Sequence, residues 1–174
     1  MVLCDDEGLA EHLRDRRDYD NRDTLAQHFP YKMTDMQAAM GRVQLQKLSG
    51  FLARRRDISL QYSDTLREVP LVLPESGEHV FFRYVVLSKA RVAMERYLYA
   101  QGVEAKRPVY LPAHQYFSGE KKNARVRLQE RYPVADRAHA EALSLPIHPG
   151  MTDADVNHVA QCVQRFFEEQ DKDV

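Results

Sequence analysis

Residues 29–66 read FPYKMTDMQAAMGRVQLQKLSGFLARRRDISLQYSDTL, and this stretch decides how the chain is organised. Thr34 and Gln37 form a capping-box pattern, in which a hydroxyl and an amide each satisfy a free backbone N–H at a helix start. Apolar residues then recur at helical spacing until Pro70, whose ring does not fit a helix interior. The pattern predicts one long helix within residues 33–70.

A helix of this length is uncommon inside a small domain, so we expect it to bridge two domains or to lie along a subunit interface. Its methionines, Met36 and Met40, are expected to pack in a core, the alternative being a binding surface. Arg54, Arg55 and Arg56 lie among acidic residues in the helical pattern. We interpret these arginines as a solvated face, because such side chains on helices usually cover surface.

The chain before this helix carries weaker patterns. Residues 1–4 are apolar and indicate a short strand. Asp5 and Asp6 can cap a following helix. Pro30 then keeps the approach to the long helix non-helical.

The chain after the long helix alternates between strand and helix patterns, which predicts an α/β fold made of a small sheet with packed helices. The predicted elements are strands at 80–87 and 103–110 and helices at 89–101, 134–143 and 153–167. Ser88 caps the first of these helices and Gly102 stops it, while Thr152 and Asp155 cap the last. Residues 118–131 are charged and weakly patterned and are expected to form an exposed loop or a short mobile helix.

Composition and charge argue against several classes of protein. Of the 174 residues, 44% are hydrophobic and 29% charged, as in globular proteins, and no apolar run is long enough for a membrane span. The formal net charge of -1 argues against a general attraction to nucleic acid. Cys4 and Cys162 form no CxxC pair, and the seven histidines form no zinc-binding pattern. We therefore expect a cytoplasmic protein that binds no membrane, nucleic acid or metal.

Three motifs carry a resemblance to a known family. Residues 29–66 resemble the segment of DegT/DnrJ aminotransferases in which an aromatic-Asn-Tyr-Arg-Met loop leads into a Gln-Ala-Ala helix. Residues 102–114, GVEAKRPVYLPAH, are similar to a stretch that ends in a Pro-Leu-His-like triplet. Residues 143–166, LSLPIHPGMTDADVNHVAQCVQRF, resemble the closing proline-flanked strand and final helix. Over nearly its whole length, the chain resembles the C-terminal part of a DegT/DnrJ-type sugar aminotransferase dependent on pyridoxal phosphate (PLP).

The resemblance implies a C-terminal portion of a fold type I aminotransferase. Residues 1–32 would be a remnant of the large PLP-binding domain, 33–70 a connecting or interface helix, and 71–174 the small α/β domain. It also implies a homodimer. The lysine that forms the Schiff base with PLP would lie shortly before Met1, so we expect neither a catalytic residue nor bound PLP in this chain alone. The lysines present lie in other motif contexts: Lys32, Lys47, Lys89, Lys106, Lys121, Lys122 and Lys172.

Two groups of site residues follow from the resemblance. The family's Asn and Arg, which help to hold the PLP phosphate from the partner subunit, correspond to Pro30 and Lys32, and lysine keeps the charge but loses the fork of arginine. Tyr31 and Lys32 are thus the candidate cofactor-binding residues, unless they merely pack and solvate the helix entry.

His114 matches a family histidine near the substrate opening, and Arg107 and Tyr110 lie beside it. These three residues are the candidates for binding an acidic nucleotide-sugar. The alternative is that His114 is a partly buried histidine satisfied by backbone and that Tyr110 fills core.

Two functions follow from these observations. In the first, the chain is a fragment of a nucleotide-sugar aminotransferase, which would move an amino group from a donor such as glutamate to a keto-sugar nucleotide and would be inactive as this chain alone. In the second, it is a truncated, non-catalytic paralogue that acts as a dimerisation or interaction module.

Overall fold

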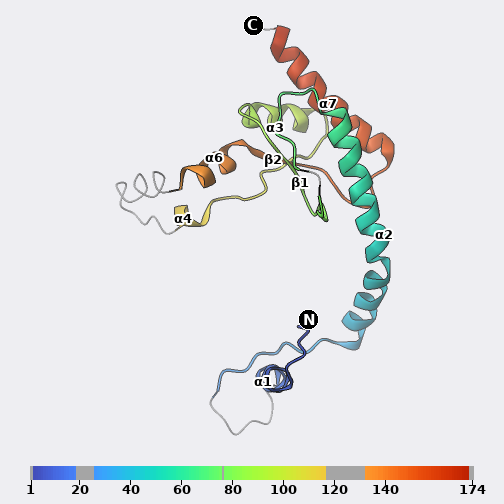
Figure 1. Ribbon diagram of the computed structural model, residues 1–174, viewed down its shortest axis with the longest axis vertical. Helices are drawn as coiled ribbons and strands as arrows, with labels where there is room; N and C mark the ends of the chain where they lie inside the picture. The colour runs from blue at the N-terminus through green and yellow to red at the C-terminus, as the bar shows by residue number, and fades with distance from the viewer. Residues whose placement is uncertain (1, 19–25, 76, 117–131, 173–174) are drawn as a thin grey trace. The chain divides into compact units, whose positions relative to one another are not determined.

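The computed structural model describes residues 2–18, 26–75, 77–116 and 132–172. Contacts between residues divide the chain into two units, Met1–Leu48 and Ser49–Val174. The predicted division at residues 32 and 70 stays a prediction. In chain order the elements are α1 (Glu7–Arg17), α2 (Asp35–Thr65), β1 (Tyr84–Leu87), α3 (Arg91–Ala100), α4 (Ala113–Tyr116), α6 (Pro133–Glu141), β2 (Ala142–Leu145) and α7 (Asp153–Lys172) (Figure 1).

The first unit contains α1 and the start of α2. The Asp6 carboxylate accepts a hydrogen bond from the Leu9 N–H at 2.6 Å, which confirms the predicted cap. The predicted strand at 1–4 is wrong for the part that the structure describes, because residues 2–4 have no strand conformation. Val2 and Leu3 are exposed and gain no partner strand among the described residues.

The long helix α2 begins as predicted. The Thr34 N–H donates to Gln37 Oε1 at 3.0 Å, and the Gln37 N–H donates to Thr34 Oγ1 at 3.3 Å. The prediction that the methionines pack in a core is wrong, since Met36 is 75% exposed and Met40 58% exposed. None of the described helices is long and apolar enough to cross a membrane.

A small antiparallel sheet organises the second unit. Tyr84 of β1 lies opposite Leu145 of β2, and Leu87 lies opposite Ala142. All four residues of β2, Ala-Leu-Ser-Leu, are buried, so the strand has no exposed face among the described residues. Among the described residues the sheet has two strands, and isolated bridges flank it at Val72–Leu87 and Lys106–Ser144.

The predicted strands were longer than the strands in the structure. The strand predicted at 80–87 begins only at Tyr84, because Phe81 has a φ of 46° and its N–H donates to His79 Nδ1 at 2.8 Å. The strand predicted at 103–110 forms only the bridge at Lys106, and Pro108 has no N–H to extend it.

Helix boundaries follow the predicted caps more closely. Thr152 and Asp155 bond each other reciprocally and begin α7, as predicted. Gly102 has a φ of 78° and follows α3, which confirms the predicted stop. The predicted cap by Ser88 is wrong, because α3 begins three residues later at Arg91 and its N-cap residue is Ala90, which has no side-chain capping hydrogen bond; Ser88 Oγ accepts instead from the Ala90 N–H at 3.1 Å. The helix predicted at 134–143 ends at Glu141, since the next residues pair with β1. The predicted loop at 118–131 lies outside the described residues.

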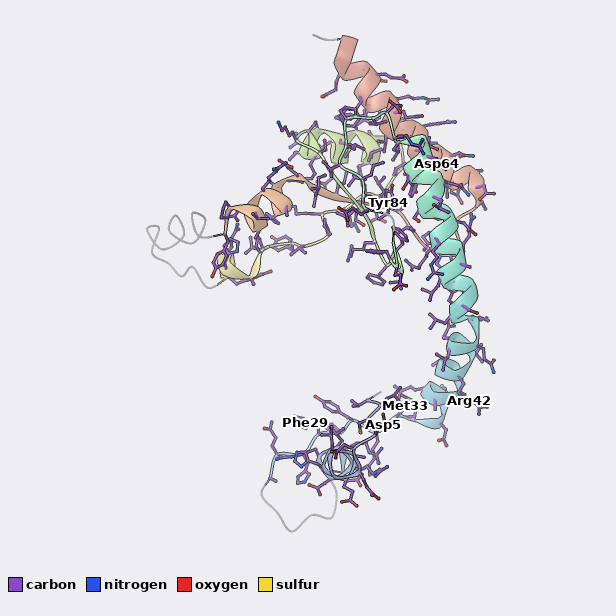
Figure 2. The ribbon with its side chains drawn as sticks, in the orientation of Figure 1. Asp5, Phe29, Met33, Arg42, Asp64 and Tyr84 are labelled. Atoms are coloured by element: carbon purple, nitrogen blue, oxygen red, sulfur yellow. The ribbon has the colours of Figure 1, made fainter. Side chains whose placement is uncertain are left out.

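The core of the second unit lies between the C-terminal half of α2, the sheet, α3 and α7. Two tyrosines place their hydroxyls in it: Tyr62 donates to the Pro146 carbonyl at 2.8 Å, and Tyr84, labelled in Figure 2, shares a 2.9 Å hydrogen bond with Ser63. Burial raises the pKa of both hydroxyls, so each stays protonated and polar within an apolar core. The largest fully buried side chains are Tyr62, Tyr84, Ile58, Leu66, Met94, Leu98, Leu143 and Leu145.

Two arginines of α2 donate hydrogen bonds to loop carbonyls beside this core. Arg55 Nη1 donates to the carbonyls of Phe81 at 3.0 Å, Phe82 at 3.0 Å and Ile147 at 3.2 Å. Arg54 Nη2 donates to the Met151 carbonyl at 2.7 Å. The interpretation of Arg54 and Arg55 as a solvated face is therefore wrong, because both guanidinium groups satisfy loop carbonyls that would otherwise lack a donor.

We expect Arg55→Ala to lower the free energy of unfolding by about 2 kcal/mol, because partly buried carbonyls lose a charged donor. Arg56→Ala is the matched control: Arg56 is exposed, and we expect a change within about 0.5 kcal/mol. Urea unfolding followed by tyrosine fluorescence measures both. Equal midpoints for the two variants would show that the three carbonyl contacts do not stabilise the fold.

Candidate functional site

The predicted substrate-binding residues meet at helix α6. Arg107 and Tyr110 lie on the segment that follows α3, and His114 belongs to α4. Asp136 and His139 of α6 are three residues apart, so they share one face of the helix, and each contacts one of these segments. We call Arg107, Tyr110, His114, Asp136 and His139 the α6 cluster.

His114 is held by a carboxylate. Its Nε2 lies 2.9 Å from Asp136 Oδ1, and Gln115 Nε2 donates to the same oxygen at 2.8 Å. The His114 side chain is 10% exposed and that of Asp136 23% exposed. The Tyr132 ring packs on the imidazole with 5.1 Å between ring centroids. The imidazole is thus fixed on two sides, by a hydrogen bond and by an aromatic face.

Asp136 is ionised in this environment. Burial opposes the charge, but hydrogen bonds from Gln115 and His114 and the nearby charges of His114 and His139 outweigh burial and lower the pKa of the carboxyl below its ordinary value. Its Oδ2 atom is buried and has no hydrogen-bond partner among the described residues. Oδ1 therefore accepts both of the hydrogen bonds seen here.

His139 and Arg107 converge on one carbonyl. His139 Nε2 lies 2.9 Å from the Tyr110 carbonyl oxygen, and Arg107 Nη1 lies 3.5 Å from it. A carbonyl only accepts, so Nε2 carries the hydrogen and donates. The 3.2 Å separation of Arg107 Nη1 and His139 Nε2 is then a close approach of two donors, not a hydrogen bond.

The alternative reading of these residues fails in two respects. His114 is partly buried, but its partner is a carboxylate and not the backbone. Tyr110 is 83% exposed and does not fill the core. The sequence analysis missed Asp136 and His139, although their spacing of three in a predicted helix was a readable sign of a shared polar face.

The candidate cofactor-binding residues lie on the extended segment before α2, within the first unit. Tyr31 is 74% exposed, and its ring stacks on Phe29, which Figure 2 labels, at 5.1 Å between centroids. Lys32 Nζ lies 2.8 Å from Asp18 Oδ1, and the Lys32 side chain is 56% exposed. Their role toward a cofactor stays a prediction.

Comparison with known proteins settles the family. The sequence model of the DegT/DnrJ/EryC1/StrS aminotransferase family matches residues 1–164. This chain belongs to that family. Members of the DegT family use PLP, and the predicted fold class is confirmed, because the structural neighbours are fold type I aminotransferases and the fold is mixed α/β.

Two relatives are named as aminotransferases of dTDP-linked sugars. The chain is 28% identical over 171 residues to the dTDP-3-amino-3,6-dideoxy-alpha-D-galactopyranose transaminase of Aneurinibacillus thermoaerophilus, with 95% of this chain and 46% of the relative covered. It is 33% identical over 141 residues to the dTDP-4-dehydro-2,3,6-trideoxy-D-glucose 4-aminotransferase of Saccharopolyspora spinosa, with 77% and 34% covered.

Among solved structures, S. venezuelae DesV in complex with a ketimine intermediate superposes with a TM-score of 0.81 at 25% identity, covering 96% of this chain and 46% of DesV. The aminotransferase TlmJ from Streptoalloteichus hindustanus has a TM-score of 0.69 at 31% identity, covering 82% and 38%. The chain spans about half the length, or less, of the relatives it matches.

The four lysines whose side chains the structure describes all lie at the surface. Lys47 and Lys89 are exposed, Lys32 pairs with Asp18, and Lys106 pairs with Glu104 at the surface. A lysine that bonds to PLP needs an enclosed amine beside phosphate ligands. None of these four lysines has that environment, so no step of the chemistry is assigned to them.

We expect the stabilising effect of Asp136 to depend on pH. Because its folded pKa is lowered, its contribution is present above the ordinary aspartate value and is lost as pH falls through the folded value. Asp136→Ala should therefore destabilise the fold at neutral pH, and its difference from wild type should shrink below about pH 4. Urea midpoints of both proteins at several pH values measure this, with the exposed Val134→Ala as control. A difference that stays constant with pH would contradict the assignment.

Proposed function

We propose that this chain is the C-terminal, substrate-side portion of a PLP-dependent nucleotide-sugar aminotransferase, which transfers an amino group from a donor such as glutamate to a keto-sugar nucleotide. The observation that carries the proposal is the convergence of Arg107, Tyr110 and His114 on helix α6. The family membership and the relatives that are named as sugar transaminases support it.

The α6 cluster has the chemistry that an acidic sugar nucleotide requires. Arg107 is permanently charged, and its planar fork matches a phosphate in geometry. The exposed ring of Tyr110 offers a flat apolar surface and a hydroxyl, as in other ligand sites where aromatic side chains combine with a few polar groups. The cluster is therefore suited to binding and orienting a substrate, while bond-making chemistry requires the lysine of the large domain.

Lys32 and Tyr31 are proposed to contact the PLP phosphate in the assembled enzyme. The ion pair between Lys32 and Asp18 is largely exposed, and such pairs contribute about 0–1 kcal/mol. Lys32 can consequently exchange its partner for a phosphate at little cost. We propose that the assembled enzyme is a cytoplasmic homodimer, in which these two residues act on the site of the partner subunit.

The activity test combines this chain with the lysine-bearing domain of a family member. We expect the mixture to transaminate a keto-sugar nucleotide with glutamate, and Arg107→Ala to raise KM for the sugar nucleotide by at least about tenfold, because a charge-assisted contact is lost. The measurement is the formation of 2-oxoglutarate.

Arg96→Ala is the matched control, since Arg96 is exposed on α3 and lies outside the cluster. The chain alone, mixed with PLP and reduced with borohydride, should gain no single-lysine adduct by intact mass. An adduct at one lysine, or an unchanged KM in Arg107→Ala, would refute the proposed division of roles.

A second function, a dimerisation module, is favoured by one observation. Met36, Met40 and Val43 of α2 are all exposed and recur at helical spacing on one face, which we call the α2 stripe. Contiguous exposed apolar residues of this kind often mark an interface. This function and the aminotransferase both require association through α2.

We expect the chain to self-associate through the α2 stripe. Met40→Lys should shift the dimer toward monomer in analytical ultracentrifugation, because an interface would have to bury the introduced charge. Leu45→Lys is the matched control: Leu45 is also exposed, but lies about 180° from Met36 around the helix. A wild-type chain that stays monomeric at about micromolar concentration, or equal effects of both variants, would argue against the stripe.

A further inference from the structure

The contact between Asp136 and His114 determines which nitrogen of the imidazole carries hydrogen. An ionised carboxylate only accepts hydrogen bonds, and Asp136 Oδ1 lies 2.9 Å from His114 Nε2. Nε2 must therefore donate. In the neutral ring, Nδ1 is then the only acceptor.

The surroundings keep the ring from turning over. Gln115 Nε2 occupies the same carboxylate oxygen at 2.8 Å and fixes the position of Asp136. The Tyr132 ring lies against the imidazole at an angle of 33°. The His114 side chain is only 10% exposed, and a ring turned by 180° about the Cβ–Cγ bond would place Cε1 in the position of Nε2 and lose the hydrogen bond to Asp136.

The position of Asp136 itself is built into the fold. Helix α6 runs directly into the buried strand β2, and its last turn is held by two contacts: Arg91 Nε donates to the Ala140 carbonyl at 3.0 Å, and the Ser88 N–H donates to the Glu141 carbonyl at 3.0 Å. The carboxylate that faces His114 is thus carried on a rigid element, as a group that orients another needs to be.

We propose that Asp136 is a positioning residue, which fixes His114 as the Nε2–H tautomer and so presents Nδ1 as a hydrogen-bond acceptor toward a hydroxyl of a sugar substrate. The choice of substrate rests on the proposed function, whereas the tautomer does not. A bare ring nitrogen accepts a hydrogen bond from a substrate hydroxyl, whereas a ring N–H at that position would only donate to the hydroxyl oxygen. Asp136 therefore acts through His114 and does not touch substrate.

The test is the ring nitrogen spectrum of the ¹⁵N-labelled chain, recorded about two pH units above the ordinary histidine value of about 6.5. Long-range ¹H–¹⁵N correlation distinguishes the two tautomers, and His114→Gln identifies the His114 signals by their loss. We expect one protonated Nε2 and one bare Nδ1 in the wild type. A protonated Nδ1, an averaged pair or a doubly protonated ring would overturn the proposal.

Variants of Asp136 sharpen the result. Asp136→Ala should move the His114 signals toward those of a freely exchanging imidazole, and Asp136→Glu should restore the Nε2–H pattern. Val134→Ala, which changes an exposed side chain of the same helix, should leave it unchanged. A wild-type pattern in Asp136→Ala would refute the role of the carboxylate. If Asp136→Ala does not fold, the wild-type spectrum alone decides.

The spectrum needs neither cofactor nor substrate, so its outcome is separate from that of the proposed function. In the two-domain assay, Asp136→Ala should raise KM for the sugar nucleotide by about tenfold and leave kcat largely unchanged, because uniform substrate binding is lost. A fixed tautomer without transamination would leave Asp136 as the group that orients His114 and would reject the sugar aminotransferase. Transamination with an averaged tautomer would support the sugar aminotransferase and would reject Asp136 as the group that orients His114.

Discussion

The guanidinium group of Arg55 holds the ends of the small sheet. Its Nη1 bonds Phe81 and Phe82, which precede β1, and Ile147, which follows β2. A two-stranded ladder alone is marginally stable, so its strands need support from outside the sheet. Helix α2 supplies that support through a charge-assisted contact at the point where both strands leave the core, and Tyr62 adds a hydrogen bond to Pro146 at the same end.

The sheet in turn decides where the candidate site lies. Because β2 starts at the residue after α6, the antiparallel register that buries β2 also sets the rotation of α6. Asp136 and His139 consequently face the segments that carry His114 and Tyr110. A shift of one residue in the register would turn β2 over and move both side chains away. The packing of β2 in the core therefore also determines the geometry of the α6 cluster.

The sequence predicted what depends on local chemistry. The capping boxes of α2 and α7 and the stop at Gly102 need only neighbours three or four residues away, and all three were recovered. The length of the strands and the role of Arg55 depend on contacts between residues far apart in sequence, which periodicity does not encode. In the candidate site, the family resemblance predicted Arg107, Tyr110 and His114. Their partners Asp136 and His139 were identified from the structure, in which α6 lies against these residues.

The two groups of candidate residues differ in how firmly they are held. The α6 cluster is assembled within Ser49–Val174 by hydrogen bonds to a rigid helix, and its histidine is nearly enclosed. Tyr31 and Lys32 lie on an extended segment, where their described contacts are a ring stack, a backbone hydrogen bond from the Tyr31 N–H to the Phe29 carbonyl and a surface ion pair. Ordering a mobile side chain on binding costs free energy and lowers the affinity. A side chain that is already held in position adds no such cost. The α6 cluster is thus organised before any ligand arrives, whereas Tyr31 and Lys32 make largely exposed contacts in the part of the chain that the structure describes.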